Sequence, residues 1–445
     1  MKKSSPLLII FLVVFIDLVG FGIVIPILPY YAKAYGASAT TLGWLMTSYS
    51  LMQFFFAPVW GRLSDRIGRR PVLLGSMAGS VISLLILGWA PSLFWLFVGR
   101  TFAGMCGANI STATAYIADV TDEKDRARGM GMIGAAFGLG FIFGPAIGGV
   151  LSRFGYGVPM FAAAALSAAN ILFAWFKLAE PVTDPAVRAA HQERRFDAAA
   201  LRRTLADPRT RVAVGLFFLV TIAFTQMEVT LALFVQARHG FGAQRTGWLL
   251  ALMGVVMVIV QGGLIGRLTA WAGETRLIIG GTLLMAVALL LVGSSLHLAP
   301  LYVGLALLAL GSGVTNPALS SLASRGAPPE SRGATMGVYQ SSGSLARVAG
   351  PVLAGYTYDH FGNGRPFLVA AGIMALAFWG TTLWYAGSSS GMREVVAVFR
   401  QSGLRGLGKA YGWKVIAGFF VYYLIRDLTI YVLLPWLAAK GLLAL

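Results

Sequence analysis

Cysteine is almost absent from this sequence, which contains a single one, Cys106, inside an apolar stretch. One cysteine excludes disulfides within the chain and metal sites built from several thiolates. Charged residues are also scarce, at 12% of 445 residues, whereas hydrophobic residues make up 57%. So few charges do not cover the surface of a water-soluble protein of this length. The composition therefore favours an integral membrane protein.

Acidic residues are half as numerous as basic ones, and the formal net charge is +18. Nucleic-acid-binding proteins share such a balance, but here the basic residues lie between apolar runs and not on one face of a domain. A membrane enzyme needs clustered histidine, cysteine or acidic residues at the membrane edge. The loop carboxylates are typical of ordinary helix ends: Asp119, Asp122, Glu123 and Asp125. We therefore expect no enzyme activity, no metal and no cofactor.

Long apolar segments dominate the chain, and about 20 such residues are enough for a helix to cross a bilayer. Twelve segments qualify: 7–30, 41–60, 71–90, 93–117, 130–151, 158–177, 211–236, 247–266, 276–296, 300–323, 334–357 and 365–386. The sequence predicts an all-α integral membrane protein. Its expected parts are an N-terminal six-helix bundle at 1–178, a cytoplasmic linker at 179–210 and a C-terminal six-helix bundle at 211–390.

The tail, residues 391–445, begins with a basic stretch typical of a helix lying on the cytoplasmic membrane surface. Residues 413–434 are long enough to span once more, although Arg426 and Asp427 lie near their centre. We interpret the tail as a basic surface segment followed by an extra membrane helix. A hairpin or an interfacial helix is the alternative.

Basic residues are distributed unequally between the two sides of the expected helices. Only Lys33, Arg153, Arg238, Arg245 and Arg365 fall in loops on one side, and the other basic loop residues of the twelve-helix body fall on the opposite side. Because cytoplasmic loops carry the excess of lysine and arginine, we expect a multi-pass inner-membrane protein with a cytoplasmic N-terminus.

The two sets of six segments are related in sequence. Gly61-Arg62-Leu63-Ser64 recurs as Gly266-Arg267-Leu268-Thr269, and Gly144-Pro145 recurs as Gly350-Pro351. A parallel repeat of six helices is typical of transporters that bind substrate near the membrane midplane, between the repeats.

A charged turn between the second and third segments is the most specific motif. Its glycines permit a sharp turn, and Asp65 is placed to cap a helix end and to accept hydrogen bonds from arginines. The residues of this conformational loop are Gly61, Asp65, Arg66, Gly68, Arg69 and Arg70.

This turn resembles the signature loop of the major facilitator superfamily, and the resemblance extends over residues 7–386. The segment 17–29 resembles the first helix of the twelve-helix drug:proton antiporters, which include tetracycline-efflux and multidrug-efflux proteins. Residues 100–104 are similar to their helix-4 motif. A third segment is similar to their helix-5 motif, with Gly140, Gly144, Pro145, Gly148 and Gly149. The resemblance implies the major facilitator fold, two six-helix bundles in a pseudo-twofold parallel repeat, alternating access and proton-driven export.

The sequence departs from tetracycline exporters at informative positions. Ala270 stands where Asp65 would repeat in the second half. Met257 and Met285 stand where the resemblance implies a histidine in helix 8 and an aspartate in helix 9. These departures argue against tetracycline itself as the substrate.

Ionisable residues within the apolar segments are the main functional candidates, because each is costly inside a bilayer. They are Asp17, Arg100, Glu228 and Arg347. All four histidines lie in loops, so Asp17 and Glu228 are the candidate proton carriers. Glu228 and Arg347 lie at similar depths, and we expect an ion pair between them in at least one conformation. Packing carboxylates and static ion pairs remain the alternatives.

Polar and aromatic residues within the segments are candidates for lining a substrate cavity. They are Gln53, Asn109, Tyr116, Gln226, Gln261, Asn316, Tyr339 and Gln340. The overall prediction is a proton-coupled exporter of lipophilic small molecules, functional as a monomer, whose partners are substrate, protons and the bilayer. The alternatives are an uptake symporter on the same fold and, less favoured, a membrane scaffold or enzyme.

Overall fold

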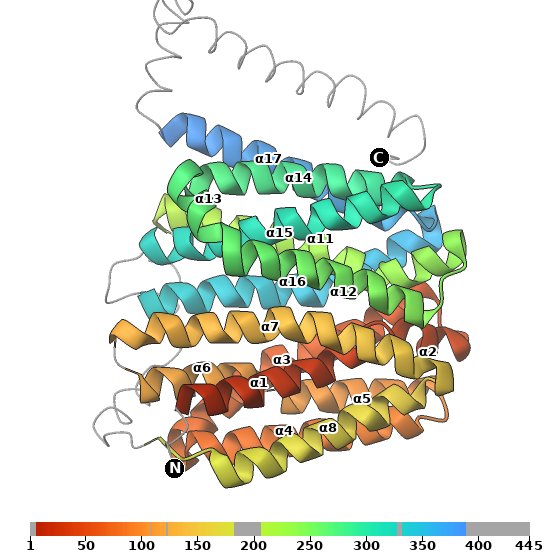
Figure 1. Cartoon of the computed structure of the whole chain (residues 1–445). Coiled ribbons are helices and arrows are strands. Elements are labelled where there is room, and N and C mark those ends of the chain that lie inside the picture. The colour runs from red at the N-terminus through yellow and green to blue at the C-terminus, as the bar shows by residue number, and fades with distance from the viewer. Residues whose placement is uncertain (1–5, 108, 122, 182–205, 327–331, 389–445) are drawn as a thin grey trace, which may run out of the picture. The chain divides into compact units, whose positions relative to one another are not determined.

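The structure is a computed structural model that describes residues 6–107, 109–121, 123–181, 206–326 and 332–388. All regular secondary structure in these residues is helical, which confirms the all-α prediction (Figure 1). Most of the expected linker at 179–210, and the whole tail at 391–445, lie outside the described residues.

Each of the twelve expected segments contains a helix or a broken pair of helices. The first half consists of α1 (Pro6–Val24), α2 (Leu28–Ala34), α3 (Ala39–Ile67), α4 (Arg69–Trp89), α5 (Leu93–Cys106), α6 (Asn109–Val120), α7 (Glu123–Leu151) and α8 (Gly157–Lys177). The second half consists of α11 (Pro208–His239), α12 (Ala243–Ile259), α13 (Ile265–Ala272), α14 (Glu274–Ser294), α15 (Leu298–Gly326), α16 (Arg332–Phe361) and α17 (Arg365–Ser388).

Three of the expected segments are broken helices, which the apolar pattern alone did not indicate. α1 and α2 are separated beside Pro26 and Pro29, because proline lacks the N–H that would continue the helix. α5 ends at a cap on Gly107. A π-helical turn, Val260–Leu264, separates α12 from α13 and contains Gly262 and Gly263.

The described helices pack on one another within each half of the chain and across the two halves. In the first half, α1 packs on α7 and α8, and α4 packs on α5 and α8. In the second half, α11 packs on α15 and α16, and α14 and α12 pack on α15. The halves meet chiefly through two helix pairs, α7 with α12 and α3 with α16. Residues 1–378 form one compact unit that contains these contacts, and residues from Trp379 belong to a second unit.

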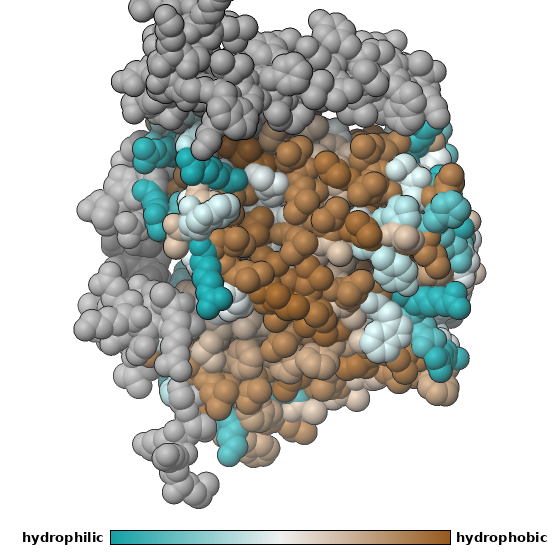
Figure 2. Space-filling view, turned by 45° about the horizontal axis from the view of Figure 1, so that its top comes forward, coloured by the Kyte–Doolittle hydropathy of each residue, from teal (hydrophilic) through white to brown (hydrophobic). Residues whose placement is uncertain are grey.

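The surface carries the pattern of a multi-pass membrane protein. Figure 2 shows an apolar band with polar residues along both of its edges. Among the described residues, ten spans are long and apolar enough to cross a membrane. α3 and α16 are not among these ten, and they are the helices that pair across the two halves. A helix that faces the protein interior tolerates more polar residues than one that faces lipid.

Glycines let α7 approach its neighbours at backbone distance. A Cβ at Gly144 would lie 2.6 Å from the Cα of Gly22 in α1, and a Cβ at Gly140 would lie 2.8 Å from the Cβ of Leu18. Gly148 faces α1 in the same way, at the backbone of Ile23. The opposite side of α7 faces α12: Gly149 packs on Gln244, and Gly247 packs on Pro145. α7 is therefore held between α1 of its own half and α12 of the other.

We predict that Gly144→Ala destabilises the protein by about 1–3 kcal/mol, the usual cost of forcing extra atoms into a packed core. Gly134→Ala is the matched control, because Gly134 lies on the same helix with nothing within 4 Å of an added Cβ. Thermal unfolding of both variants in detergent measures the difference. Equal unfolding temperatures would contradict the close approach of α1 and α7.

Candidate functional site

The two halves are sealed together at one end of the molecule, where α3 and α16 pack backbone to backbone. Gly43 packs against the Pro351 carbonyl, and a Cβ at Gly355 would lie 2.7 Å from the Cα of Thr40. The Thr47 hydroxyl donates a hydrogen bond of 2.8 Å to the Val348 carbonyl. Substituting a larger side chain at either glycine would push the two halves apart.

Side-chain hydrogen bonds reinforce this closed end. The Tyr30 hydroxyl of α2 bonds the Thr246 hydroxyl at 2.7 Å and donates to the Phe241 carbonyl at 3.0 Å. Lys33 Nζ donates to Gln236 Oε1 at 2.9 Å. All of these bonds join the first half to the second.

Asp359, near the end of α16, completes the closed end as a cross-half cap on α3. Its carboxylate accepts hydrogen bonds from the backbone N–H of Ala39 at 3.1 Å and of Thr40 at 2.8 Å, and from the Thr40 hydroxyl at 2.7 Å. A carboxylate at a helix N-terminus is also stabilised by the helix dipole. Burial raises the pKa of Asp359, but the hydrogen bonds outweigh it and hold this pKa below its usual value of 3.8. Sequence reasoning missed Asp359, which belongs to no recognisable motif.

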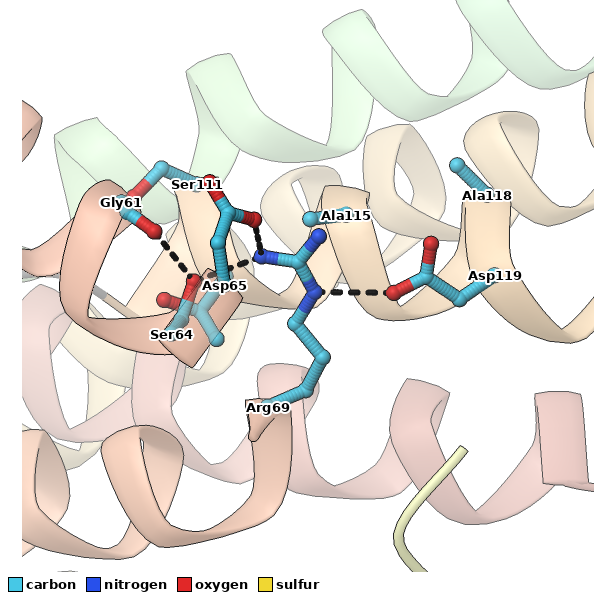
Figure 3. Close-up of a pocket in the computed structure, with 9 residues that line it drawn as sticks. Gly61, Ser64, Asp65, Arg69, Ser111, Ala115, Ala118 and Asp119 are labelled. Carbon is cyan, nitrogen blue, oxygen red and sulfur yellow. Dashed lines mark hydrogen bonds and ion pairs between the residues drawn. The ribbon is translucent and has the colours of Figure 1, made fainter. Parts of the chain in front are cut away.

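The signature loop lies where α3 meets α4, away from the closed end, and forms an ionic network around Arg69. Arg69 Nη1 lies 2.7 Å from Asp65 Oδ1, and its Nε lies 2.8 Å from Asp119 Oδ2 (Figure 3). Nη1 also donates to the Ser64 hydroxyl at 2.6 Å. Asp119, which the sequence pattern assigned to an ordinary helix end, is thus a second carboxylate of the loop.

Glu180 caps the N-terminus of α4. The sequence pattern predicted Asp65, and not Glu180, as the carboxylate that caps a helix end here. The two carboxylate oxygens of Glu180 accept hydrogen bonds from the backbone N–H of Arg69 at 2.6 Å and of Arg70 at 2.9 Å. The preceding residue, Gly68, has a φ of +106°, which permits the expected sharp turn and lets Glu180 approach closely. Asp65 lies in the last turn of α3 instead and binds the Arg69 side chain.

The remaining loop residues also contact the first half or solvent. Arg70 donates to the Trp175 carbonyl at 2.6 Å and lies over the Trp175 ring. Arg66 is exposed. Gly61 lines a cavity of about 240 Å³ together with the network residues and the small side chains of α6 (Figure 3). All lining residues of this cavity belong to the first half.

The interior charges of the first half lie near Tyr49 of α3. Asn109 Nδ2 donates a hydrogen bond of 2.8 Å to Asp17, which joins α6 to α1. The Arg100 guanidinium lies over the Tyr49 ring, 4.3 Å from its centroid. Gln53 Nε2 donates to the Gly107 carbonyl at 3.2 Å and to the Tyr49 hydroxyl at 3.4 Å. Asp17, Asn109, Arg100 and Gln53 are thus brought into one region.

The interior charges of the second half face the same region. Glu228 of α11 interacts electrostatically with Arg347 of α16 and, across the two halves, with Arg100 of α5. Arg347 Nη2 donates to the Ser344 hydroxyl at 3.3 Å. Within the described residues, no ion pair shorter than 4.0 Å joins Glu228 to either arginine. The direct pair of Glu228 with Arg347 is not formed in this conformation and stays a prediction for another.

Two aromatic cavity candidates are buried in this conformation, and their place in a substrate cavity stays a prediction. Tyr116 is fully buried in the core of the first half, and its hydroxyl donates to the Ala179 carbonyl at 2.9 Å. Tyr339 is buried against Phe217, with stacked rings 4.0 Å apart. In this conformation both rings pack against other side chains. The apolar surface of a tyrosine is stabilised by burial in a core as well as by contact with an apolar ligand.

The other amide candidates differ in exposure. Gln226 is completely buried and neither of its side-chain amide atoms has a hydrogen-bond partner. Gln261 lies in the π-helical turn, Asn316 is partly buried in α15, and Gln340 is exposed. Within the part of the chain that the structure describes, no group of histidine, cysteine, aspartate or glutamate residues is arranged to hold a metal ion.

Two helical bundles in a membrane, sealed at one end around interior charges, define a transporter that works between the two sides of a bilayer. The sequence profile of the Major Facilitator Superfamily matches residues 10–351 and 264–443. The chain belongs to this family and is a membrane transporter, not an enzyme.

Named relatives cover most of the chain. It is 33% identical over 380 residues to the "Tetracycline resistance protein, class C" of Escherichia coli, covering 84% of this chain and 95% of that protein. It is 29% identical over 390 residues to "Multidrug resistance protein 1" of Bacillus subtilis, covering 86% and 97%. The crystal structure of a human organic anion transporter has a TM-score of 0.65 and 27% sequence identity, and covers 86% of this chain and 100% of that one.

We predict that Asp119→Asn slows transport in reconstituted vesicles about as much as Asp65→Asn, by at least about tenfold. The reason is that Arg69 binds both carboxylates. Membrane insertion should be unchanged. Lys177→Gln, which removes an exposed charge at the same end, is the control. A normal rate for Asp119→Asn would exclude Asp119 from the function of the loop.

We predict that Asp359→Asn opens the closed end, because it weakens the charge-assisted cap on α3; losing such a bond costs about 1.5–3 kcal/mol. The readout is maleimide labelling of Thr47→Cys in a Cys106→Ala background. Labelling should accelerate at least about tenfold, and His360→Asn should leave it unchanged. An unchanged rate in Asp359→Asn would show that the cap does not hold this end closed.

The same cap predicts the pH dependence of closure. A lowered pKa means that the ionised cap stabilises the closed end above the ordinary aspartate value of 3.8, and that this contribution is lost as pH falls through the lower pKa of Asp359. Labelling of Thr47→Cys in the Cys106→Ala background, with Asp359 intact, is compared at each pH with the Asp359→Asn variant, so that the pH dependence of the thiol itself cancels. The difference between the two should persist as pH falls from neutral to 3.8.

Proposed function

We propose that this transporter is a proton-coupled exporter of lipophilic small molecules that works by alternating access. The observation that carries the proposal is the placement of Asp17 and Glu228. They are carboxylates in the interiors of α1 and α11, one in each half, and both interact electrostatically with groups around Tyr49 and Arg100. An ionisable residue at such a depth is costly and is retained for function.

The closed end is the outer gate in this proposal. The excess of basic residues supports a cytoplasmic location for the opposite end, where the signature loop lies. The conformation described is then open toward the cytoplasm. Glycines near this cytoplasmic end, in α7 and in the π-helical turn after α12, support the assignment, because Gly131, Gly134, Gly262 and Gly263 have nothing within 4 Å of an added Cβ.

Transport then requires the two halves to rock about the centre. Opening the outer gate breaks the Tyr30, Thr47 and Asp359 hydrogen bonds and separates α3 from α16. Proton and substrate drive this exchange only if each favours a different conformation. Asp17 suits the proton, because its hydrogen bond with Asn109 joins α1 to α6 and a change of charge at Asp17 alters that link.

The names of the relatives support export of small lipophilic compounds, since they include tetracycline and multidrug resistance proteins. The sequence argues against tetracycline itself, because Met257 and Met285 stand where the resemblance to tetracycline exporters implies ionisable residues; Met285 is buried and Met257 is partly buried. The proposed substrate is instead another lipophilic small molecule, which binds to the groups around Tyr49. Uptake together with protons is the alternative on the same fold.

We predict that Asp17→Asn abolishes proton coupling but not substrate binding, because the variant loses a titratable group and keeps its shape. Proteoliposomes loaded with a pH-sensitive dye measure proton movement while substrate is transported down an imposed gradient. Wild-type protein should move protons opposite to the substrate, and the variant should move none. Protons moving with the substrate would establish the uptake symporter, and normal coupling in Asp17→Asn would place the carrier elsewhere.

A further inference from the structure

Arg100 is a buried cation, and no carboxylate of the described residues lies within 4.0 Å of its guanidinium. Its side chain is 6% exposed, and its Nε has no hydrogen-bond partner. The guanidinium lies over the Tyr49 ring, 4.3 Å from its centroid. Arginine does not lose its proton in proteins. A buried guanidinium that cannot be neutralised requires a counter-charge.

Arg347 is in a similar position on the other half. Its hydrogen-bond partner is the Ser344 hydroxyl at 3.3 Å, one turn earlier on its own helix. Among the residues that the structure describes, no carboxylate lies within 4.0 Å of it. A neutral hydroxyl supplies no counter-charge for this guanidinium.

The interior carboxylates do not contact these arginines: within the described residues, neither Asp17 nor Glu228 lies within 4.0 Å of either guanidinium. Glu228 acts electrostatically on both Arg100 and Arg347 without contacting either. Asp17 is bound by Asn109 and acts on Tyr49. Within the described residues, both guanidinium groups therefore lack a carboxylate in direct contact.

The surroundings of the arginines define the ligand that would supply the missing charge. Guanidinium groups bind carboxylate, sulfonate or phosphate groups through paired, charge-assisted hydrogen bonds. Tyr49 and Phe21, with rings 5.7 Å apart, add apolar surface beside Arg100. We propose that the transported substrate is a lipophilic organic anion whose acidic group is bound by Arg100 and Arg347. This inference rests on the proposed transport function and names its substrate class.

Because the two arginines belong to different halves, a bound anion bridges the halves. Glu228 competes with the substrate for the same cations. The substrate's acidic group therefore takes over the position of counter-ion that Glu228 holds in the empty protein, and removing the Glu228 charge strengthens anion binding.

Binding of three probes with the same ring system tests the charge preference. The probes are naphthoate, naphthylmethanol and naphthylmethylammonium, titrated calorimetrically into the full chain in lipid nanodiscs. Naphthoate should bind at least about tenfold more tightly than the neutral alcohol, and the ammonium compound more weakly still. A preference for the ammonium compound, or equal affinities, would overturn the proposal.

Variants assign the preference to the arginines. Arg347→Gln should remove the preference for naphthoate, Arg347→Lys should restore part of it, and Glu228→Gln should increase naphthoate affinity. Arg276→Gln, which removes an exposed charge of α14, is the control for net charge. A preference that survives in Arg347→Gln would overturn the assignment, and the Arg347→Lys and Glu228→Gln results identify a variant that merely misfolds.

Transport assays separate this inference from the proposed function. If proteoliposomes export naphthylmethylammonium against a proton gradient and ignore naphthoate, the exporter function stands and the anion inference fails. If naphthoate binds through Arg347 but no probe moves with proton exchange, the anion inference stands and the proton-coupled exporter fails.

Discussion

Placing an ionised side chain in the hydrocarbon of a bilayer costs free energy, and this cost determines where the candidate functional residues of the protein lie. The apolar band of the surface leaves the interface between the halves as the place where interior charges avoid lipid. Asp17 and Arg100 lie in the first half and Glu228 and Arg347 in the second, and all four interact with Tyr49 or with one another. The same cost accounts for the pairing of α3 with α16, the two least lipid-like of the long helices.

Close packing connects these charges to the contacts that hold the halves together. α1 carries Asp17 and, five residues further on, Gly22, which packs on Gly144 of α7. The next residue of α7, Pro145, packs on Gly247 of α12 in the other half. These two backbone contacts are close-packed and leave no room for adjustment. A shift of α1 would therefore move α7, and with it the contact between α7 and α12. The glycine-proline motif in this way packs α7 against both halves.

Much of the fold followed from the sequence, because membrane helices are marked by long apolar runs and by glycine-rich turns. The Gly68 turn and the glycine face of α7 were predictable on those grounds. The helix breaks beside Pro26 and at residues 260–264 were not predictable, because the apolar run is the same whether the helix is continuous or broken. The burial of Tyr116 and Tyr339 was not predictable either, since burial in a core and exposure to a cavity favour the same aromatic residues.

The candidate site was predictable only in part. Asp17, Arg100, Glu228 and Arg347 stood out as charges in apolar segments. Asp359, Asp119 and Glu180 did not, because each is a carboxylate near a helix end, where carboxylates are common. Only their partners in space distinguish them: the α3 N-terminus for Asp359, Arg69 for Asp119 and the α4 N-terminus for Glu180.

The most direct test of alternating access is a pair of distance measurements between spin labels in a Cys106→Ala background. One label pair replaces Ala37 and His360 at the closed end, and the other replaces Arg62 and Arg267 at the opposite end. In the protein alone, the first distance should be short and the second long. Acidification or substrate should lengthen the first and shorten the second together. Distances that stay fixed, or that lengthen at both ends, would contradict a rocking of the two halves.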